Sequence, residues 1–527
     1  MHENRETSSL TGQQRSSPAG KGDSHNTSMN GGEESDGVEV PMKPLNKIME
    51  QQAKIAEKAE GRTPAKENIG QKHTPPAQDG KGVSQGLAGV RKVALERKQE
   101  RFTTLLHHVN VDLLRASFHA LKKNAAPGVD GVTWQEYENG LEDRLADLKD
   151  RVHRGAYRAQ PSKRIYIPKA DGRQRPIGIA ALEDKIVQQA VVTILNAIYE
   201  VDFRGFSYGF RPGRSPHQAL DALSVGIQRK RVNWILDADI RSFFDRMSHE
   251  WTVKFVQHRI ADKRILRLIQ KWLQAGVSEE GEWSETTMGT PQGAVISPLL
   301  ANVYLHHVFD LWLEVWRKKR ACGEMIAVRF ADDLVVGFEH RAEAERFLKE
   351  FQERLAKFGL ELNTDKTRLI EFGRYAQAHR RARGEEEPER FTFLGFTHQC
   401  GINSIGNFSI ERRTERKRLE AKLQQVKRML RQRMHAPVPQ MGEWLQRVVN
   451  GYFQYHGVPG NLSSLYRFRD RVVRYWRHVL SRRSQRGRVT IERIARLSER
   501  WLPPPEVRHP YPSARFDARI QGRSRMR

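Results

Sequence analysis

The sequence predicts an α+β protein in which a region of mixed helices and strands is followed by a basic helical region. Three observations predict this. Residues 1–101 contain no Phe, Tyr or Trp, although the 527-residue chain has 10 Trp, 12 Tyr and 22 Phe. Between about 100 and 400, strand-like apolar runs alternate with helical spacing of apolar residues. From Thr414 onward the apolar spacing is helical, and Lys and Arg fill the other faces.

The N-terminal region, residues 1–90, is expected to be largely disordered. It is rich in Gly, Ser, Gln, Asn and Pro, and such a composition buries too little apolar surface to offset the entropy lost on ordering. We place the mixed domain at 91–400, a helical domain at 401–480 and a basic C-terminal region at 481–527.

Within the mixed region, helices are predicted over 112–123 and 181–199. Strands are predicted at 234–236, 325–329 and 334–336, because β-branched and aromatic residues dominate there. Residues 374–390 are polar and are expected to form an exposed loop. In the helical region Leu419, Leu423, Val426 and Leu430 recur every three to four residues, and a second amphipathic run covers 465–480. Tyr452 and Trp476 are expected in the core of these helices.

Charge indicates the kind of partner. The chain has 90 Lys and Arg against 63 Asp and Glu, a net charge of +27. Residues 411–527 alone carry 29 basic and 9 acidic residues, a net charge of +20. A solvated helical surface explains alternating charge better than charge of one sign, so the excess predicts binding to nucleic acid.

Cysteine usage and hydropathy exclude several classes of protein. The two cysteines, Cys322 and Cys400, cannot form a four-cysteine zinc site and make a disulfide framework implausible. No apolar run is long enough to span a bilayer, and the N-terminus lacks the apolar stretch of a signal peptide. We therefore expect a soluble protein of a reducing compartment, without a membrane partner.

Two acidic segments carry the chemistry. One is an apolar strand that runs into Asp237 and Asp239; the other is Asp332-Asp333 between two apolar strands, which predicts a β-hairpin with both carboxylates near its tip. Adjacent carboxylates in apolar strands are costly because they repel and lose water. Mg²⁺ removes both costs, and two such ions can activate a 3′-hydroxyl and stabilise a leaving pyrophosphate. A solvated Asp-Asp turn is the alternative, which the second acidic strand disfavours.

These segments belong to a series of motifs that resembles the reverse transcriptases of group II introns and related elements. The resemblance covers about 100–400, in the family's order. Its elements are Asn124–Gly131; Ile167-Pro168-Lys169 with Arg175–Ile179; Ser207–Ser215; Gly289–Gly293 with Ser297–Leu300; Phe330-Ala331-Asp332-Asp333; Leu362-Asn363 with Lys366-Thr367; and Phe393–Phe396. The resemblance implies a right-hand polymerase fold, with fingers, a palm containing an antiparallel sheet, and a following α-helical thumb and maturase domain.

The resemblance also implies the metal site. Asp239, Asp332 and Asp333 would hold two Mg²⁺ ions, and Lys366 resembles a proton donor to pyrophosphate. Asp237 competes with Asp239 for the first role. Asp239 is preferred because the family places an aromatic residue five positions after the metal-binding aspartate, where Phe244 stands. Asp333 would be the peripheral ligand of the three, as the second Asp of such pairs often is.

The resemblance further implies the nucleotide site. Lys169 and Arg175 would grip the triphosphate of a deoxynucleotide, and Gln292 would contact the same nucleotide. Phe244 would lie under the sugar and exclude a 2′-hydroxyl. Its neighbour Phe243 is expected to be ordinary core.

The basic region resembles the thumb and maturase domain that binds intron RNA and assists splicing. Four of its cations are candidate RNA contacts: Arg471, Arg474, Arg482 and Arg483. The partners implied are group II intron RNA, an RNA template with a DNA primer or target DNA, and deoxynucleoside triphosphates, in the bacterial cytoplasm. The Cys- and His-rich endonuclease domain of some members is not expected in this sequence.

Two other functions stay open at this point. One is a reverse transcriptase of a retron, defence system or diversity-generating element, which the basic region disfavours because such enzymes usually lack it. The other is a splicing-only RNA-binding protein with an inactive polymerase, which the intact Asp239, Asp332 and Asp333 disfavour. The oligomeric state does not follow from the sequence.

Overall fold

The computed structural model describes residues 81–520 except 169–173, 386, 404 and 484–487. These residues lie in one unit, Met49–Arg527. Its first element, α2 (Lys81–Glu96), buries Val90 and Ala94 and packs on α6 (Leu182–Asp202). The helix α2 therefore begins inside the stretch 1–90 that is expected to be largely disordered, and residues 1–80 lie outside the described residues.

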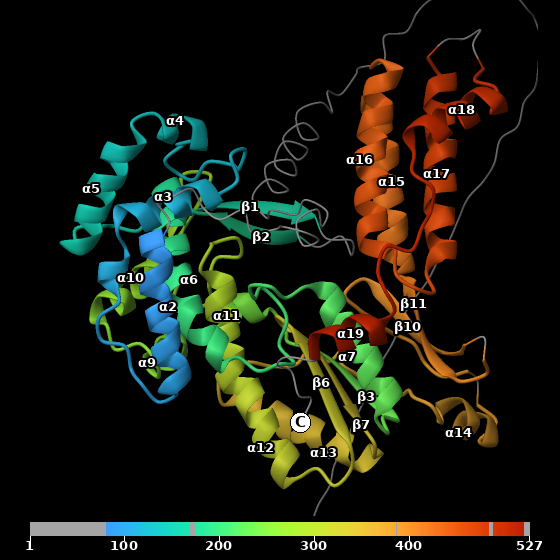
Figure 1. The fold of residues 1–527 in the computed structure, drawn as a ribbon, viewed down its shortest axis with the longest axis horizontal. Coiled ribbons are helices and arrows are strands. Elements are labelled where there is room, and N and C mark those ends of the chain that lie inside the picture. The colour runs from blue at the N-terminus through green and yellow to red at the C-terminus, as the bar shows by residue number, and fades with distance from the viewer. Residues whose placement is uncertain (1–80, 169–173, 386, 404, 484–487, 521–527) are drawn as a thin grey trace, which may run out of the picture. The chain divides into compact units, whose positions relative to one another are not determined.

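A four-stranded antiparallel sheet, the central sheet, carries both acidic segments (Figure 1). Its strand order is β6-β7-β3-β8. The strands are β3 (Trp234–Asp239), β6 (Met325–Phe330), β7 (Asp333–Phe338) and β8 (Arg368–Glu371). All three predicted strands are thus present, and the antiparallel pairing expected for this region is confirmed.

Successive residues of each strand in the central sheet point to opposite faces, and the two faces pack against different hydrophobic cores. Leu236 and Ala238 of β3 face a core shared with helices of the mixed region. Ile235 faces a second core, which it shares with α7 and the strands β9 to β11. The main helices between residues 216 and 356 are α7 (Pro216–Arg229), α9 (His249–Gln257), α10 (Lys263–Gln274), α11 (Ser297–Leu305), α12 (Leu311–Lys319) and α13 (Arg341–Ala356). A π-helical segment, His306–Asp310, joins α11 to α12.

A second sheet, with order β2-β1-β4-β5, lies earlier in the chain. Its strands are β1 (Ser162–Pro168), β2 (Gln174–Ile179), β4 (Val277–Glu279) and β5 (Glu282–Ser284). The antiparallel β1–β2 pair brings the two halves of the Ile167–Ile179 motif together. It follows three helices, α3 (Val111–Ala120), α4 (Trp134–Glu138) and α5 (Leu141–His153). The predicted helices at 112–123 and 181–199 correspond to α3 and α6.

One element and one boundary differ from the prediction. The polar stretch 374–390 contains a helix, α14 (Ala376–Ala382), which the dense charges conceal in the sequence. A three-stranded sheet, β11-β10-β9, then crosses the expected boundary at 401. Its strands are β9 (Phe391–Phe393), β10 (Phe396–Ile402) and β11 (Phe408–Thr414). The helical segment therefore begins at Arg416, where α15 starts.

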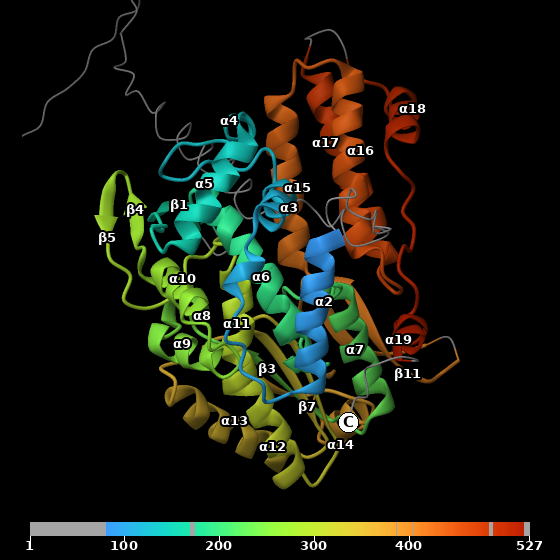
Figure 2. The ribbon, with the colours of Figure 1, turned by 60° about the vertical axis from the view of Figure 1, so that its left-hand side comes forward.

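The helical segment comprises four helices that pack along one another (Figures 1 and 2). They are α15 (Arg416–Gln432), α16 (Val438–His456), α17 (Leu462–Ser481) and α18 (Ile491–Trp501). They share a core in which Tyr452 and Trp476 are buried, as predicted. Ile494 of α18 belongs to that core, so the expected boundary at 481 cuts through one packed unit. Among the described residues, none of the helices has the length and apolarity needed to cross a membrane.

The last described helix, α19 (Pro512–Ile520), returns to pack on α7 beside the central sheet. The buried carboxylate of Asp221 on α7 lies 2.8 Å from Arg412 Nη1 of β11 and 3.1 Å from Arg515 Nε of α19. His509, just before α19, stacks on His217 of α7 with ring centroids 3.8 Å apart. The chain therefore contacts α7 both before and after the helical segment.

Candidate active site

The central sheet brings the two acidic segments together. Asp239, the last residue of β3, lies directly opposite Asp333, the first residue of β7. Directly opposed residues on antiparallel strands have Cβ atoms about 4.5–5.5 Å apart. Asp332 stands in the two-residue turn that joins β6 to β7. The three predicted metal ligands therefore gather at one end of one sheet, as the hairpin prediction requires.

The hairpin turn is strained at the residue before the carboxylates. Ala331 has φ +57°, a value that costs a residue with a Cβ about 1–2 kcal/mol. The surrounding backbone holds it: a Cβ on Gly209 would lie 2.3 Å from Ala331 N, so only glycine allows the approach. Tyr208 N also donates to Arg329 O at 2.8 Å. Residues of the Ser207–Ser215 motif therefore support the hairpin that carries Asp332 and Asp333.

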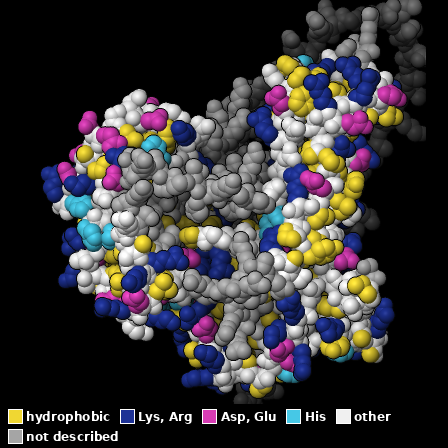
Figure 3. All heavy atoms as spheres, viewed as in Figure 1, with side chains coloured by type: hydrophobic (Ala, Val, Ile, Leu, Met, Phe, Trp, Pro, Cys, Tyr) yellow, Lys and Arg dark blue, Asp and Glu magenta, His cyan; other side chains and the backbone are white. Residues whose placement is uncertain are grey.

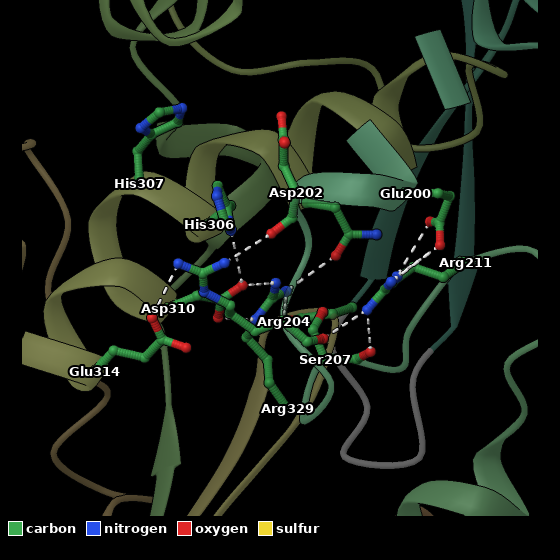
Figure 4. Close-up of polar contacts among 12 residues, drawn as sticks. Glu200, Asp202, Arg204, Ser207, Arg211, His306, His307, Asp310, Glu314 and Arg329 are labelled. Carbon is green, nitrogen blue, oxygen red and sulfur yellow. Dashed lines mark hydrogen bonds and ion pairs between the residues drawn. The ribbon is translucent and has the colours of Figure 1, made fainter. Parts of the chain in front are cut away.

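A fully buried arginine fixes the same turn from the other side of the sheet. Arg329 donates to both carboxylate oxygens of Asp310, at 2.8 and 2.7 Å, and both side chains are 0% exposed (Figure 4). It also donates to Asn302 Oδ1 at 2.9 Å and to the Ala331 carbonyl at 3.2 Å. Asn302 in turn donates to Gly209 O at 2.8 Å. Sequence reasoning did not single out these residues, although a charged residue inside the apolar run of β6 is a signal.

Electrostatics at the carboxylates favour a cation. Desolvation, and next the charges of Asp332 and Asp239, raise the pKa of Asp333 to about 7. Burial, and next the charge of Asp239, raises the pKa of Asp332. Within the described residues, no Lys or Arg forms an ion pair with Asp332 or Asp333. A bound cation would offset both the desolvation and the mutual repulsion that disfavour the charged carboxylates.

Asp239, unlike Asp332 and Asp333, forms an ion pair with a lysine among the described residues. Lys366 Nζ lies 3.0 Å from Asp239 Oδ2, and Asn363 Nδ2 donates to the same oxygen at 3.2 Å. The competitor Asp237 lies on the same face of β3, but opposite Arg368 of β8 rather than opposite Asp333. Burial, and then repulsion from Asp239, raises its pKa to about 6. The position of Asp239 beside the hairpin supports the choice of Asp239 as the metal ligand.

The donor set fits a hard divalent cation. In the described part of the chain, no group of three or more His, Cys, Asp or Glu side chains is placed so that it could hold a metal ion without other ligands. Mg²⁺ is commonly held by one or two carboxylates, its remaining ligands being water and substrate phosphate. Asp332 and Asp333, which have raised pKa values and no ion pair in the described residues, suit that incomplete coordination.

A cavity of about 260 Å³ lies between the second sheet and the Gly289–Gly293 motif. Gln292 lines it and links two charged groups, because Arg175 Nε donates to Gln292 Oε1 at 2.7 Å and Gln292 Nε2 donates to Asp245 Oδ1 at 3.3 Å. The structure thus brings Arg175 and Gln292 together. Lys169 lies outside the described residues.

The two adjacent phenylalanines have different environments. Phe243 is 2% exposed and packs edge-on against Tyr304, so the prediction that it is core is confirmed. Phe244 is half-buried, and its carbonyl accepts from Thr290 N at 2.8 Å, next to the cavity. Its role against a sugar stays a prediction.

The four candidate RNA-binding arginines differ in availability. Arg474 and Arg482 are exposed, and Arg471 is half-buried. Arg483 donates to the Ala436 carbonyl at 2.5 Å, a contact that joins the ends of two helices. Lys and Arg side chains gather over the upper end of the helical segment in the view of Figure 3. Arg483 is therefore the weakest of the four candidates for an RNA contact.

Comparison with known proteins agrees with this geometry. Residues 167–398 match the family model described as reverse transcriptase (RNA-dependent DNA polymerase). The chain is 35% identical over 275 residues to Protein YkfC of Escherichia coli strain K12, which covers 46% of this chain and 72% of that protein. This chain belongs to the reverse transcriptase family. Membership of this family implies a polymerase fold with palm and fingers.

Other relatives identify the branch of the family. The chain is 30% identical over 302 residues to the group II intron-encoded protein LtrA of Lactococcus lactis subsp. cremoris, covering 55% of this chain and 50% of LtrA. It is 34% identical over 200 residues to an uncharacterised 91 kDa protein in the cob intron of Schizosaccharomyces pombe, covering 38% of this chain and 24% of that protein. The predicted relation to group II intron reverse transcriptases and maturases is confirmed. The chain spans about half the length of LtrA.

Proposed function

We propose that the chain copies RNA into DNA at the carboxylate cluster by two-metal nucleotidyl transfer, and that its helical segment is a thumb and maturase domain that binds group II intron RNA to assist splicing and mobility. The single observation that carries the polymerase proposal is the meeting of Asp239, Asp332 and Asp333 at one end of the central sheet. We also propose that it acts in the bacterial cytoplasm, bound to that RNA.

The carboxylates would hold the metal and position the reacting groups. Asp239 and Asp332 would provide the principal oxygens, and Asp333 a peripheral one. Two bound Mg²⁺ ions would lower the cost of forming the attacking 3′-oxygen and of releasing pyrophosphate. Lys366 would have to leave Asp239 when that carboxylate takes up a ligand, because Asp239 Oδ2 accepts from its ammonium group at 3.0 Å. The released ammonium would then be free to donate a proton to the departing pyrophosphate.

The nucleotide would enter the cavity beside Gln292. Arg175 lies against Gln292 and would bind the triphosphate, where a cation offsets the charge that develops on transfer. Lys169 would share that role. Phe244 would pack under the sugar, so that a 2′-hydroxyl would meet its ring. The cavity would thus hold a deoxynucleoside triphosphate between the cations that bind its phosphates and the Phe244 ring that excludes a 2′-hydroxyl.

Primer extension tests the polymerase proposal. Purified chain is given an RNA template, an annealed DNA primer, Mg²⁺ and deoxynucleotides. Asp239→Ala and Asp332→Ala should each lower the extension rate by several orders of magnitude. Asp365→Ala, an exposed aspartate beside Lys366, serves as the matched control and should extend normally. Extension by Asp239→Ala at the wild-type rate would transfer the ligand role to Asp237.

A further inference from the structure

Phe210 is an exposed aromatic residue that has no role in the proposed metal and nucleotide sites. It lies in the Ser207–Ser215 motif and is 58% exposed. Its φ is +56°, in the left-handed region that favours glycine. Residues with a Cβ keep such a conformation only where their surroundings impose it, and these positions cluster at functional sites. An exposed phenylalanine on a strained backbone is therefore not explained by folding alone.

Both neighbours of Phe210 are locked. Gly209 packs against the Ala331 backbone, and its carbonyl accepts from Asn302 Nδ2 at 2.8 Å. Arg211 is 6% exposed, forms an ion pair with Glu200 at 2.9 Å and donates to the Ser207 carbonyl at 2.7 Å (Figure 4). The strained residue between them is thus held rigidly, with its side chain directed outward.

The register of the central sheet shows which face Phe210 occupies. Its ring centroid lies 6.3 Å from that of Phe330. Phe330 is directly opposite Asp333, which is directly opposite Asp239. Directly opposed residues point to the same face of a sheet. Phe210 and Phe330 therefore lie on the face that carries the catalytic carboxylates, with Phe330 paired to Asp333 across the hairpin.

We propose that Phe210 contacts the RNA–DNA primer–template duplex behind the primer terminus, through the sugars exposed in its minor groove. This inference rests on the proposed polymerase function, which brings the primer end to Asp239 and Asp332. A duplex containing RNA takes the A form, with a wide, shallow minor groove that displays its sugars. An uncharged aromatic ring suits the apolar sugar carbons rather than the phosphates, and Phe330 extends the same apolar surface.

The test measures duplex binding without catalysis. A DNA primer labelled at its 5′ end is annealed to an RNA template, and its Kd for the full chain is measured by fluorescence anisotropy without deoxynucleotides. Phe210→Ala should raise this Kd by about tenfold, because burying part of an aromatic ring against the sugars contributes roughly 1–2 kcal/mol. Phe210→Tyr, which keeps the ring, should bind within about twofold of the wild type. The Kd for the single-stranded template alone should not change.

Phe210→Gly separates the ring from the backbone. Glycine relieves the strain at φ +56°, so this variant should unfold at a temperature no lower than that of the wild type. It should nevertheless lose duplex affinity as Phe210→Ala does. Tyr375→Ala, which removes a 50% exposed aromatic side chain beside α14, is the matched control and should bind normally.

The outcomes are distinct. Wild-type duplex affinity in Phe210→Ala or Phe210→Gly overturns the inference, and so does an equal loss for duplex and single strand. At saturating duplex the single-turnover extension rate of Phe210→Ala should fall much less than its affinity. If the wild-type chain binds the duplex but extends no primer when deoxynucleotides are added, the proposed polymerase function fails instead.

Discussion

Arg329 and Asp310 form a bidentate ion pair in which both side chains are fully buried. Arg329 lies in β6 just before the turn that carries Asp332, and Asp310 is the last residue of the π-helical segment between α11 and α12. Single-turn π segments are frequent at functional sites. Because the same guanidinium holds the Ala331 carbonyl and Asn302, this pair connects a helix, the π segment and the turn that carries Asp332.

The first prediction concerns this pair. Asp310→Asn should lower the free energy of unfolding by about 3–5 kcal/mol, because it leaves a buried guanidinium without its counter-charge. The double variant Arg329→Met/Asp310→Leu should recover most of that loss, since apolar residues of similar volume avoid the desolvation cost. Urea unfolding measures both. The double variant should still extend primers slowly, because the Ala331 carbonyl no longer has its donor; normal extension would show that the pair only stabilises the fold.

The second prediction concerns sugar selection. Phe244→Ala should raise incorporation of ribonucleotides relative to deoxynucleotides, because the half-buried ring beside the cavity is the group proposed to meet a 2′-hydroxyl. Single-nucleotide extension with each sugar measures the ratio of kcat/KM values. An unchanged ratio would contradict the assignment. Phe243→Ala serves as the comparison, since it removes a 2% exposed core side chain and should reduce stability without altering the ratio.

The third prediction separates RNA binding from polymerisation. Arg471→Gln/Arg474→Gln/Arg482→Gln should weaken intron binding and flatten its dependence on salt, the slope falling by about one for each phosphate that is no longer neutralised. Arg483 is left intact because it joins helix ends. Protein-assisted splicing at near-physiological Mg²⁺ should fall more than extension of an unrelated primer.

Asp332→Ala is the reciprocal variant. It should keep assisted splicing and lose extension, because splicing requires RNA held in shape rather than a catalytic carboxylate. Normal splicing by the arginine variant, or loss of splicing by a folded Asp332→Ala protein, would remove the maturase role from the helical segment.

The fourth prediction concerns pH. Burial, and next the charge of His509, lowers the pKa of His217 to about 3. Burial also lowers the pKa of His456 to about 3. Between about pH 3 and 6.5 the unfolded chain therefore binds more protons at these groups than the folded chain, so their contribution to stability falls as the pH falls through that interval. Urea midpoints measured between pH 7 and pH 4 isolate this contribution as the difference in pH slope between the wild type and a variant that lacks one of these imidazoles.

His217→Gln tests this dependence. Its pH slope should be shallower than that of the wild type by up to one proton between pH 6 and pH 4, whatever its stability at pH 7. His435→Gln, in which the replaced imidazole lies on the turn between α15 and α16, serves as the comparison and should keep the wild-type slope. Equal slopes in the wild type and His217→Gln would contradict the burial of a neutral imidazole at the contact with His509.

The sequence predicted the carboxylate cluster well, because short apolar strands ending in aspartates leave few other arrangements. It also predicted the burial of Phe243, Tyr452 and Trp476. It did not reveal Arg329 and Asp310, because their pairing depends on a contact between a strand and a π segment formed only in the folded chain. The helix α14 was missed since Arg380, Arg381 and their neighbours resemble a solvated loop. The boundary at 401 was misplaced because β10 and β11 continue past the last recognised motif.

The return of α19 to α7 gives the helical segment two anchors on the body of the protein. One is the β11–α15 junction, where Arg412 meets Asp221, and the other is the α19 end, where Arg515 meets the same carboxylate. An attachment at a single point would let the helices swing in any direction. With both ends held at α7, the helical segment cannot move as a free flap, and displacing either end requires breaking an ion pair to Asp221.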